Sequence, residues 1–221
     1  MIFIEPSLIA DFKMRIFNSD GTEAEMCGNG IRCFAKYVYE NKMTNKKNLK
    51  IETLAGIKDV TIIENNNQIQ EISVNMGRPK ILGEIKLKIL DKDFEIIKVS
   101  MGNPHAIIFI NNVDEFEVEK YGPIIENNKH FPLRTNVEFV EILDKNLIKL
   151  RVWERGAKET FACGTGSCAA VAAGIFKGML KEKTKVILKG GELKINWDGK
   201  MKSMFMEGIA NKVFDGRIYI K

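Results

Sequence analysis

One sequence pattern occurs twice in this chain of 221 residues, and the duplication limits the possible folds more than any other feature. Residues 18–33 read NSDGTEAEMCGNGIRC and residues 154–168 read ERGAKETFACGTGSC. Each copy has a Cys-Gly-x-Gly turn at the start of an apolar or alanine-rich stretch, and an amide or carboxylate side chain nine positions before its first cysteine. These pairs are Asn18 with Cys27 and Glu154 with Cys163. The chain is therefore predicted to consist of two related halves.

The two copies stay in register well beyond the cysteines, at an offset of 136 residues (163 minus 27). Segment 3–5, Phe-Ile-Glu, corresponds to segment 139–141, Phe-Val-Glu, and the chain around Arg15 corresponds to the chain around Arg151. We therefore expect an α+β fold with two pseudo-symmetric halves, each an antiparallel sheet curled around a central helix. The expected halves are residues 1–98 and 99–221, with the functional site in the cleft between them.

The same register shows a difference at the start of the chain. Residue 1 aligns with Val137, so the segment from Ser100 to Asn136, which contains Met-Gly-Asn-Pro-His ending at His105, has no counterpart in the first half. About 36 residues (136 minus 100) that the symmetry requires are absent before Met1. We therefore expect an N-terminally shortened copy of a longer protein.

Hydrophobic periodicity predicts one long helix in each half. The first is expected over residues 28–39, where apolar residues recur at spacings of three and four, and the second over the alanine-rich residues 166–179. Cys33 and Cys168 fall inside these helices and are interpreted as small core residues. A short helix is expected over residues 121–127. Alternating apolar residues predict strands over 2–5, 12–17, 49–53, 59–64, 69–75, 106–110, 137–143, 147–153, 186–188, 193–197 and 203–207, with a further strand-like stretch over 209–220.

Composition and charge exclude several classes of function. The net charge is +5 from 34 basic and 29 acidic residues, but the lysines are scattered, and no basic stripe interleaved with aromatic residues indicates nucleic-acid binding. No segment approaches the roughly 18 apolar residues of a membrane span, and no secretory signal opens the chain, so a cytoplasmic protein with reduced cysteines is expected. The spacings Cys27-x5-Cys33 and Cys163-x4-Cys168 do not match a zinc knuckle, so no metal is expected.

A cysteine just before Gly-x-Gly at the first turn of a helix is placed for chemistry. The unpaired N–H groups and the positive end of the helix dipole favour an anion there, either a substrate carboxylate or a thiolate, and glycine lets the backbone approach a ligand closely. One such turn alone is more often a helix start with an inert cysteine. Two turns at equivalent positions of a duplicated fold can bring one thiol to each face of a single carbon atom, which indicates a racemase or epimerase.

The motifs together resemble those of the diaminopimelate epimerase family. The matching blocks are CGNGIRC (27–33), MGNPH (101–105), RTNV (134–137), ERGA (154–157) and ACGTG (162–166), and they cover nearly the whole chain. The resemblance implies an epimerase that needs neither pyridoxal phosphate nor another cofactor and interconverts LL- and meso-diaminopimelate for lysine and peptidoglycan synthesis. It implies a small-molecule substrate and a possible homodimer. The family's N-terminal block, similar to Gly-x-Gly-Asn-Asp-Phe, has no match here.

The resemblance also implies a role for individual residues. Cys27 and Cys163 would be the acid and base pair, with His105 and Glu154 associated with the thiols. Residues expected around the α-carboxylate are Gly28, Asn29, Gly164 and Thr165. Residues expected to hold the amino groups and the distal carboxylate are Asn18, Asn103, Asn136, Glu154 and Arg155.

Three alternatives stay open on the sequence alone. A cofactor-independent racemase of another amino acid would use the same chemistry, although the polar residues from Asn103 to Arg155 favour a substrate with a second zwitterionic end. A thiol redox protein would place its cysteines close together in sequence, unlike Cys27 and Cys163. A non-catalytic fragment that keeps only the fold is the third alternative.

Overall fold

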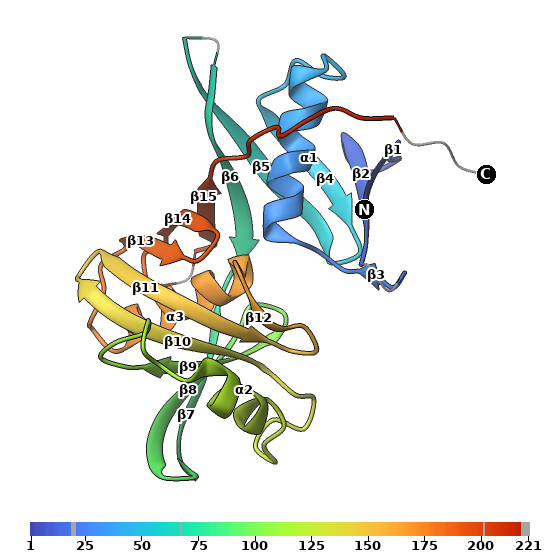
Figure 1. The fold of residues 1–221 in the computed structure, drawn as a ribbon. Helices are drawn as coiled ribbons and strands as arrows, with labels where there is room; N and C mark the ends of the chain where they lie inside the picture. The colour runs from blue at the N-terminus through green and yellow to red at the C-terminus, as the bar shows by residue number, and fades with distance from the viewer. Residues whose placement is uncertain (19–20, 67, 201, 218–221) are drawn as a thin grey trace.

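The computed structural model describes residues 1–18, 21–66, 68–200 and 202–217, and this part of the chain holds fifteen strands and three helices (Figure 1). The first strands are β1 (Ile2–Glu5), β2 (Phe12–Phe17), β3 (Glu23–Ala24), β4 (Asn48–Thr53), β5 (Gly56–Asn65) and β6 (Gln68–Gly77), with helix α1 (Gly28–Glu40) after β3. The later strands are β7 (Lys80–Ile89), β8 (Lys92–Ser100), β9 (Pro104–Phe109), β10 (Asn136–Asp144), β11 (Leu147–Glu154), β12 (Lys158–Thr160), β13 (Lys183–Leu188), β14 (Gly191–Asn196) and β15 (Met204–Gly208). Helix α2 (Val118–Glu126) follows β9, and helix α3 (Gly164–Phe176) follows β12.

The strands form one continuous sheet instead of the two separate sheets that we expected. The strand order is β1-β2-β4-β5-β6-β15-β14-β13-β11-β10-β9-β8-β7, and the antiparallel pair β6–β15 joins the two ends of the molecule. The sheet is also mixed, because β2–β4, β9–β10 and β11–β13 are parallel pairs. The expected α+β fold is confirmed, and most strand pairs are antiparallel as expected, with these three parallel pairs as the difference.

The predicted duplication extends to the hydrogen-bond register of the strands. Arg15 on β2 lies opposite Phe3 on β1, and Arg151 on β11 lies opposite Phe139 on β10. Each arginine also makes a two-pronged ion pair with a glutamate eight residues on, Arg15 with Glu23 and Arg151 with Glu159. All of these pairs are related by the offset of 136, so the two halves are built in the same way around their helices.

Strands β7 and β8 lie at one end of the sheet, next to strands that follow residue 98 in the sequence. Strands β7 and β8 pair with each other and then with β9, so they extend the sheet of the second half (Figure 1). The strand-like stretch that we expected over 209–220 is also different, because residues 209–217 contain no strand and residues 218–220 lie outside the described part of the chain.

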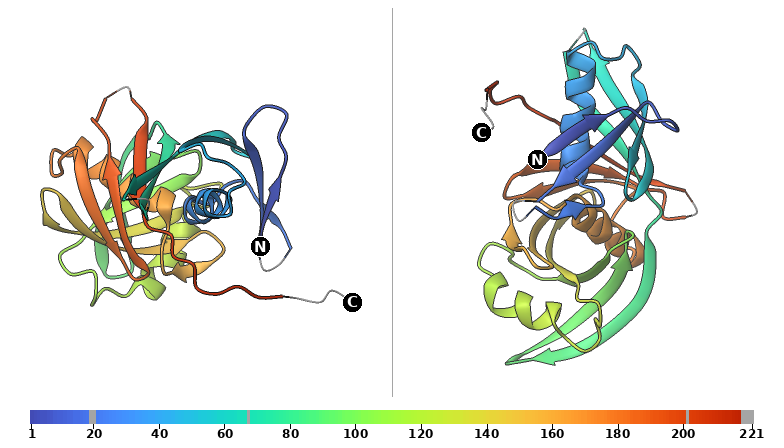
Figure 2. Two further views of the ribbon diagram at one scale, coloured as in Figure 1. Left: turned by 90° about the horizontal axis from the view of Figure 1, so that it is seen from above. Right: turned by 90° about the vertical axis from the view of Figure 1, so that its right-hand side faces the viewer.

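The two long helices are buried to different extents. Helix α1 packs one apolar face on the sheet, formed by Ile31, Phe34, Ala35 and Val38. Helix α3 lies inside the curved sheet (Figure 2), and its alanines and Val171 are buried on nearly all sides. Cys168 on α3 is buried as expected. The same expectation is wrong for Cys33, which is exposed because it lies on the opposite face of α1 from the apolar stripe.

One core runs through both halves. It contains the apolar face of α1, most of α3 and inward-facing residues from strands at both ends of the sheet. A second core lies between α2 and the outer face of β7 to β11 and is rich in aromatic rings, among them Phe94, Tyr121 and Phe139. Within the described residues, no helix is long and apolar enough to cross a membrane.

Candidate active site

Each Cys-Gly-x-Gly turn forms the start of a helix, as predicted. Cys27 is the N-cap of α1 and its Sγ accepts a hydrogen bond from the Gly30 N–H at 3.3 Å. Cys163 is the N-cap of α3 and its Sγ accepts one from the Gly166 N–H at 3.4 Å. Since the first residues of a helix have no intrahelical acceptor for their N–H groups, both turns also present N–H groups and a positive dipole end beside a sulfur.

The starts of the two helices lie close to each other. A Cβ atom added at Gly164 would lie 3.6 Å from the Cα atom of Gly28. Met206 of β15 packs against both turns, since an added Cβ would lie 2.7 Å from its Cε at Gly28 and 3.0 Å from its Sδ at Gly164. The two motifs, 136 residues apart in sequence, therefore meet at one place, and a larger side chain at either glycine would displace the end of the Met206 side chain.

Cys163 lies in a buried and acidic environment. Its Sγ is 3.6 Å from the hydroxyl oxygen of Thr165. Burial raises the pKa of the Cys163 thiol well above its usual value, the charge of Glu154 raises it further, as a charged Glu138 would, and the hydrogen bonds from Thr165 and Gly166 oppose this shift. The protonated thiol is therefore the form that this environment favours at neutral pH.

A chain of polar contacts connects Cys163 with a buried histidine. His105 is 1% exposed, and its Nε2 atom is 3.1 Å from Asn103 Oδ1. The Asn103 side-chain amide donates to the Thr165 hydroxyl at 3.4 Å, and Thr165 contacts the sulfur. Thus three predicted site residues form a connected group with the Cys163 thiol.

The loop after β11 is fixed by side chains from neighbouring elements. Asn136 Oδ1 accepts a hydrogen bond from the Arg155 N–H at 2.8 Å, and the Asn136 amide donates to the Pro104 carbonyl at 3.3 Å. Glu154 accepts a hydrogen bond from the Thr160 hydroxyl. The exposed guanidinium of Arg155 donates to the Leu133 carbonyl at 3.2 Å. These contacts bring Asn136, Glu154 and Arg155 together at the end of β11.

A buried glutamate from α2 also holds this loop. Glu126 accepts hydrogen bonds from the Gly156 N–H at 3.0 Å and from the Trp153 indole at 2.7 Å, and it pairs with Arg134. Gly156 has φ of +77°, which favours glycine. Helix α2 therefore helps to position the loop that carries Glu154 and Arg155.

The site residues expected from the first half are arranged less tightly. Asn29 Oδ1 accepts a hydrogen bond from the Arg32 guanidinium at 3.0 Å, which places it beside the first turn of α1. Asn18 is exposed at the end of β2, the position that Glu154 occupies at the end of β11. Its amide donates to the Thr22 hydroxyl at 3.0 Å. The hydrogen bonds of Asn18 in the described residues thus lie within its own turn.

Two buried charged residues at the site were missed by the sequence analysis. Arg32 is 7% exposed, donates to the Gly28 carbonyl at 3.2 Å, and has no hydrogen-bond partner at Nε within the described residues. Glu138 is 0% exposed and contacts His105. The duplication contained a signal for both, because at the offset of 136 Arg32 corresponds to Cys168 and Ile2 corresponds to Glu138. A charge in one copy where the other has a neutral residue marks a departure from the repeat.

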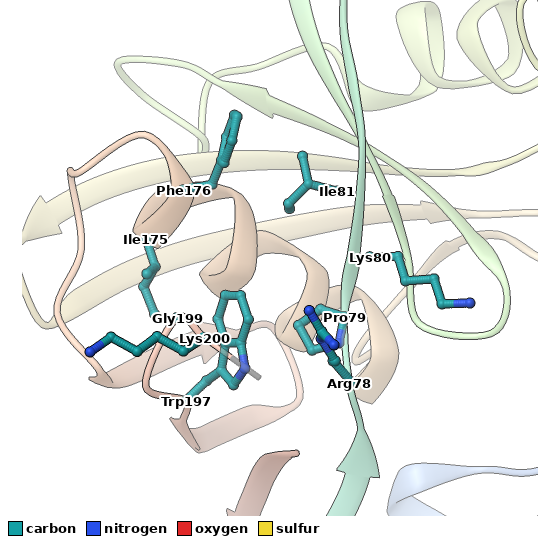
Figure 3. A pocket seen from close by; sticks show the side chains of 9 residues that line it. All are labelled: Arg78, Pro79, Lys80, Ile81, Ile175, Phe176, Trp197, Gly199 and Lys200. Carbon is teal, nitrogen blue, oxygen red and sulfur yellow. The ribbon is translucent and has the colours of Figure 1, made fainter. Parts of the chain in front are cut away.

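A surface hollow lies elsewhere and does not contain the thiols. It is lined by Arg78, Lys80, Lys200, Trp197 and residues at the C-terminal end of α3, such as Phe176 (Figure 3). The two lysine side chains point away from each other (Figure 3). Since both thiols lie at N-terminal helix ends, this hollow is separate from the candidate active site. Among the described residues, no group of three or more His, Cys, Asp or Glu side chains could hold a metal ion.

Solved structures share this fold. The structure of a hydroxyproline epimerase from Agrobacterium vitis superposes with a TM-score of 0.74 and 13% identity over 94% of this chain and 71% of that chain. A phenazine biosynthesis protein of the PhzF family from Bacillus anthracis superposes with a TM-score of 0.71 and 22% identity over 94% and 80% of the two chains. The protein is therefore of the α+β class that these structures define, here with a cysteine at the start of each long helix.

Sequence comparison identifies the family within this class. The family model described as diaminopimelate epimerase matches residues 1–82 and 97–213. The chain is 51% identical over 233 residues to a diaminopimelate epimerase of Methanococcus maripaludis, and 48% identical over 240 residues to one of Agathobacter rectalis. Both alignments cover 100% of this chain and 84% of the relative. The chain belongs to the diaminopimelate epimerase family, which confirms the resemblance seen in the motifs.

Proposed function

We propose that this protein epimerises LL-diaminopimelate to meso-diaminopimelate with two thiols and no cofactor, as a step toward lysine and peptidoglycan. The family membership supports the reaction, and one structural observation supports the mechanism: two cysteines that cap opposed helices, with Gly28 and Gly164 in near contact. We further propose that it acts in the cytoplasm as a homodimer, as the resemblance to the family implies.

The helix starts supply the stabilisation that the reaction needs. An α-proton of an amino acid is only weakly acidic, so its removal requires that the carbanion formed be stabilised. N–H groups at Gly28, Asn29, Gly164 and Thr165 are placed to bind the α-carboxylate, and two positive dipole ends would act on the negative charge that develops beside it. Such preorganised dipoles are most effective where water is excluded.

Inversion then requires a base on one face of the α-carbon and an acid on the other. One thiolate removes the α-proton, so that a C–H bond breaks and an S–H bond forms. The thiol on the other face delivers its proton to the carbon, so that its S–H bond breaks and a C–H bond of opposite configuration forms. Because its environment favours the protonated thiol, Cys163 would deliver the proton when Cys27 acts as the base, and the roles exchange in the reverse reaction.

The polar residues near Cys163 are suited to the rest of the substrate. Diaminopimelate carries a second ammonium and a second carboxylate, and a zwitterionic end of this kind needs several polar partners. Asn103, Asn136, Glu154 and Arg155 supply amide, carboxylate and guanidinium groups on the second half, and Asn18 and Asn29 supply amides on the first. We assign the distal end of the substrate to these residues, with His105 and Glu154 acting on the thiols.

The mechanism is tested with purified protein and single cysteine variants. We expect formation of meso-diaminopimelate from the LL isomer, and no epimerisation by Cys27→Ala or Cys163→Ala. In deuterated water each variant should still exchange the α-proton of one stereoisomer without inversion, and the two variants should prefer opposite isomers. Cys33→Ala, at an exposed thiol, is the matched control and should epimerise normally. Exchange of the same isomer by both variants would contradict opposed thiols.

A further inference from the structure

Glu138 is a buried carboxyl group that no step above uses. Its side chain is 0% exposed, its Oε1 atom is 2.7 Å from His105 Nδ1, and its Oε2 atom has no hydrogen-bond partner among the described residues. It also touches the start of α3, since a Cβ atom added at Gly166 would lie 2.6 Å from Oε1. Burying a carboxylate with an unsatisfied oxygen is costly, so the position of this group needs a physical reason.

The other half of the molecule shows that the fold does not require it. At the offset of 136 the counterpart of Glu138 is Ile2, and the counterpart of Gly166 is Gly30. Ile2 lies against Gly30, where an added Cβ atom would be 3.0 Å from its Cδ1. The same strand and helix turn are therefore built with an apolar side chain in the first half.

The polar contacts around His105 determine which of its nitrogens carries a proton. The Asn103 amide nitrogen donates to Thr165, so Asn103 Oδ1 is the atom that faces His105 and it can only accept. His105 Nε2 must therefore carry hydrogen. The Thr165 oxygen accepts from Asn103, which leaves its hydroxyl hydrogen free to point at the Cys163 sulfur. In this series of hydrogen bonds, each donor therefore points along the path from His105 to the Cys163 thiol.

The remaining question is the proton between Glu138 and His105. Either a carboxylate accepts from an imidazolium, or a neutral carboxylic acid donates to neutral imidazole. Burial raises the pKa of Glu138, as does the charge of Glu154, while His105 opposes the shift. An unsatisfied carbonyl oxygen of a neutral acid is also less costly than an unsatisfied carboxylate oxygen. The groups that face Glu138 are His105, Glu154 and the Cys163 thiol, so a negative charge on Glu138 would add to an already acidic environment.

We propose that Glu138 is a positioning residue that, as a neutral carboxylic acid, donates its proton to Nδ1 of His105 and so holds His105 in the Nε2–H tautomer. Through Asn103, this tautomer orients the Thr165 hydroxyl so that it donates a hydrogen bond to the Cys163 sulfur. The proposal deepens the role of the site in the proposed epimerisation and rests on it, although the tautomer itself can be measured without substrate.

The tautomer is tested by nitrogen-15 NMR of the imidazole rings in the unmodified protein at neutral pH. The chain has only two histidines, His105 and His130, so His130→Gln assigns the signals. We expect His105 to show a protonated Nε2 and an unprotonated Nδ1. An imidazolium, or a proton on Nδ1 alone, overturns the proposal whether or not the protein is an epimerase.

Two substitutions test the effect on the thiol. Glu138→Gln keeps an N–H donor toward Nδ1, so it should preserve the tautomer and leave α-proton exchange within about threefold. Glu138→Ile introduces the side chain that Ile2 has at the equivalent position of the first half. His105 should then no longer be held in the Nε2–H tautomer, and α-proton exchange by Cys163 should slow about tenfold or more. Exchange by each thiol is measured separately, in Cys27→Ala and Cys163→Ala backgrounds.

The comparison between the two thiols distinguishes positioning from a general structural role. With Glu138→Ile, exchange by Cys27 should change by less than about threefold. Equal losses at both thiols, or a loss with Glu138→Gln as large as with Glu138→Ile, overturn the proposal, and so does full activity of Glu138→Ile. Should Glu138→Ile fail to fold, the nitrogen-15 NMR of His105 and the exchange rates of Glu138→Gln still test the proposal.

Discussion

Arg32 brings a positive charge into the first turn of α1, where its described hydrogen-bond partners are neutral. Its guanidinium donates to the Gly28 carbonyl and the Asn29 side chain, and it lies 3.8 Å from the sulfur of Met206. Burial lowers the pKa of Arg32, and the anionic forms of nearby cysteines would oppose that shift. A buried cation without a carboxylate is costly, and the corresponding residue of the second half is Cys168. Like Glu138, Arg32 is thus a charge that the repeat does not need.

A substrate carboxylate would compensate this charge, and the arginine would hold Asn29 in place to receive it. Arg32→Met should therefore raise the KM for diaminopimelate by about tenfold, with a smaller change in kcat. Arg32→Lys keeps the charge but cannot contact two acceptors in the same planar arrangement, so its KM should lie between those of the unmodified protein and of Arg32→Met. Lys36→Met, which removes an equal charge from the same helix at its ion pair with Glu40, is the control. An unchanged KM for Arg32→Met would contradict this role.

Among the elements, α3 differs most from its counterpart because it is enclosed by the sheet. Cys168 lies in the middle of this enclosed helix, and burial raises the pKa of its thiol well above the usual value. The folded protein therefore keeps the proton at a pH where the same cysteine of the unfolded chain has lost it. Since the folded state binds more protons in this range, stability must fall as the pH rises above the ordinary cysteine pKa of about 8.5.

This contribution can be removed with one substitution. In urea unfolding between pH 8 and 10.5 under reducing conditions, Cys168→Ala should make the decline in the free energy of unfolding less steep by up to about 1.4 kcal/mol per pH unit. Cys33→Ala, at the exposed cysteine of α1, should leave the slope unchanged. A slope for Cys168→Ala equal to that of the unmodified protein would show that burial does not hold this proton.

How well the elements could be predicted follows from the repeat. Helices α1 and α3 were predicted from their helical apolar spacing and most strands from alternating apolar residues, and the repeat at the offset of 136 supported both. Strands β7 and β8 were missed although the apolar residues from Ile85 to Ile89 alternate, because they lie between the two copies and the repeat says nothing about them. Glu138 was missed because a glutamate inside an apolar strand is usually exposed, and only tertiary packing places it on α3. Cys33 was misplaced because a position inside a helix was taken as buried, whereas Cys33 lies on the face of α1 opposite the apolar stripe.

At the scale of the whole molecule, the two halves share one sheet and one hydrophobic core, which two independent domains would not do. The pair β6–β15 makes the sheet continuous, and a single core contains residues of both helices. Met206 is fully buried and contacts the starts of α1 and α3 at the same time. The candidate active site therefore lies beside a shared core, and we expect the relative position of the thiols to depend on the stability of the whole chain.

We consequently expect the protein to unfold as one cooperative unit, although chains of this length often unfold in steps. Both tryptophans, Trp153 and Trp197, are in the second half, so their fluorescence reports on that half, while hydrogen exchange of α1 reports on the first. The two probes should give the same urea midpoint. Met206→Ala should lower the free energy of unfolding by about 2–5 kcal/mol and shift both midpoints together, with little change in the denaturant slope. Met43→Ala, at an exposed methionine, is the control. If α1 loses protection at a lower urea concentration than the tryptophans report, the halves are separate units, and Met206 does not couple them.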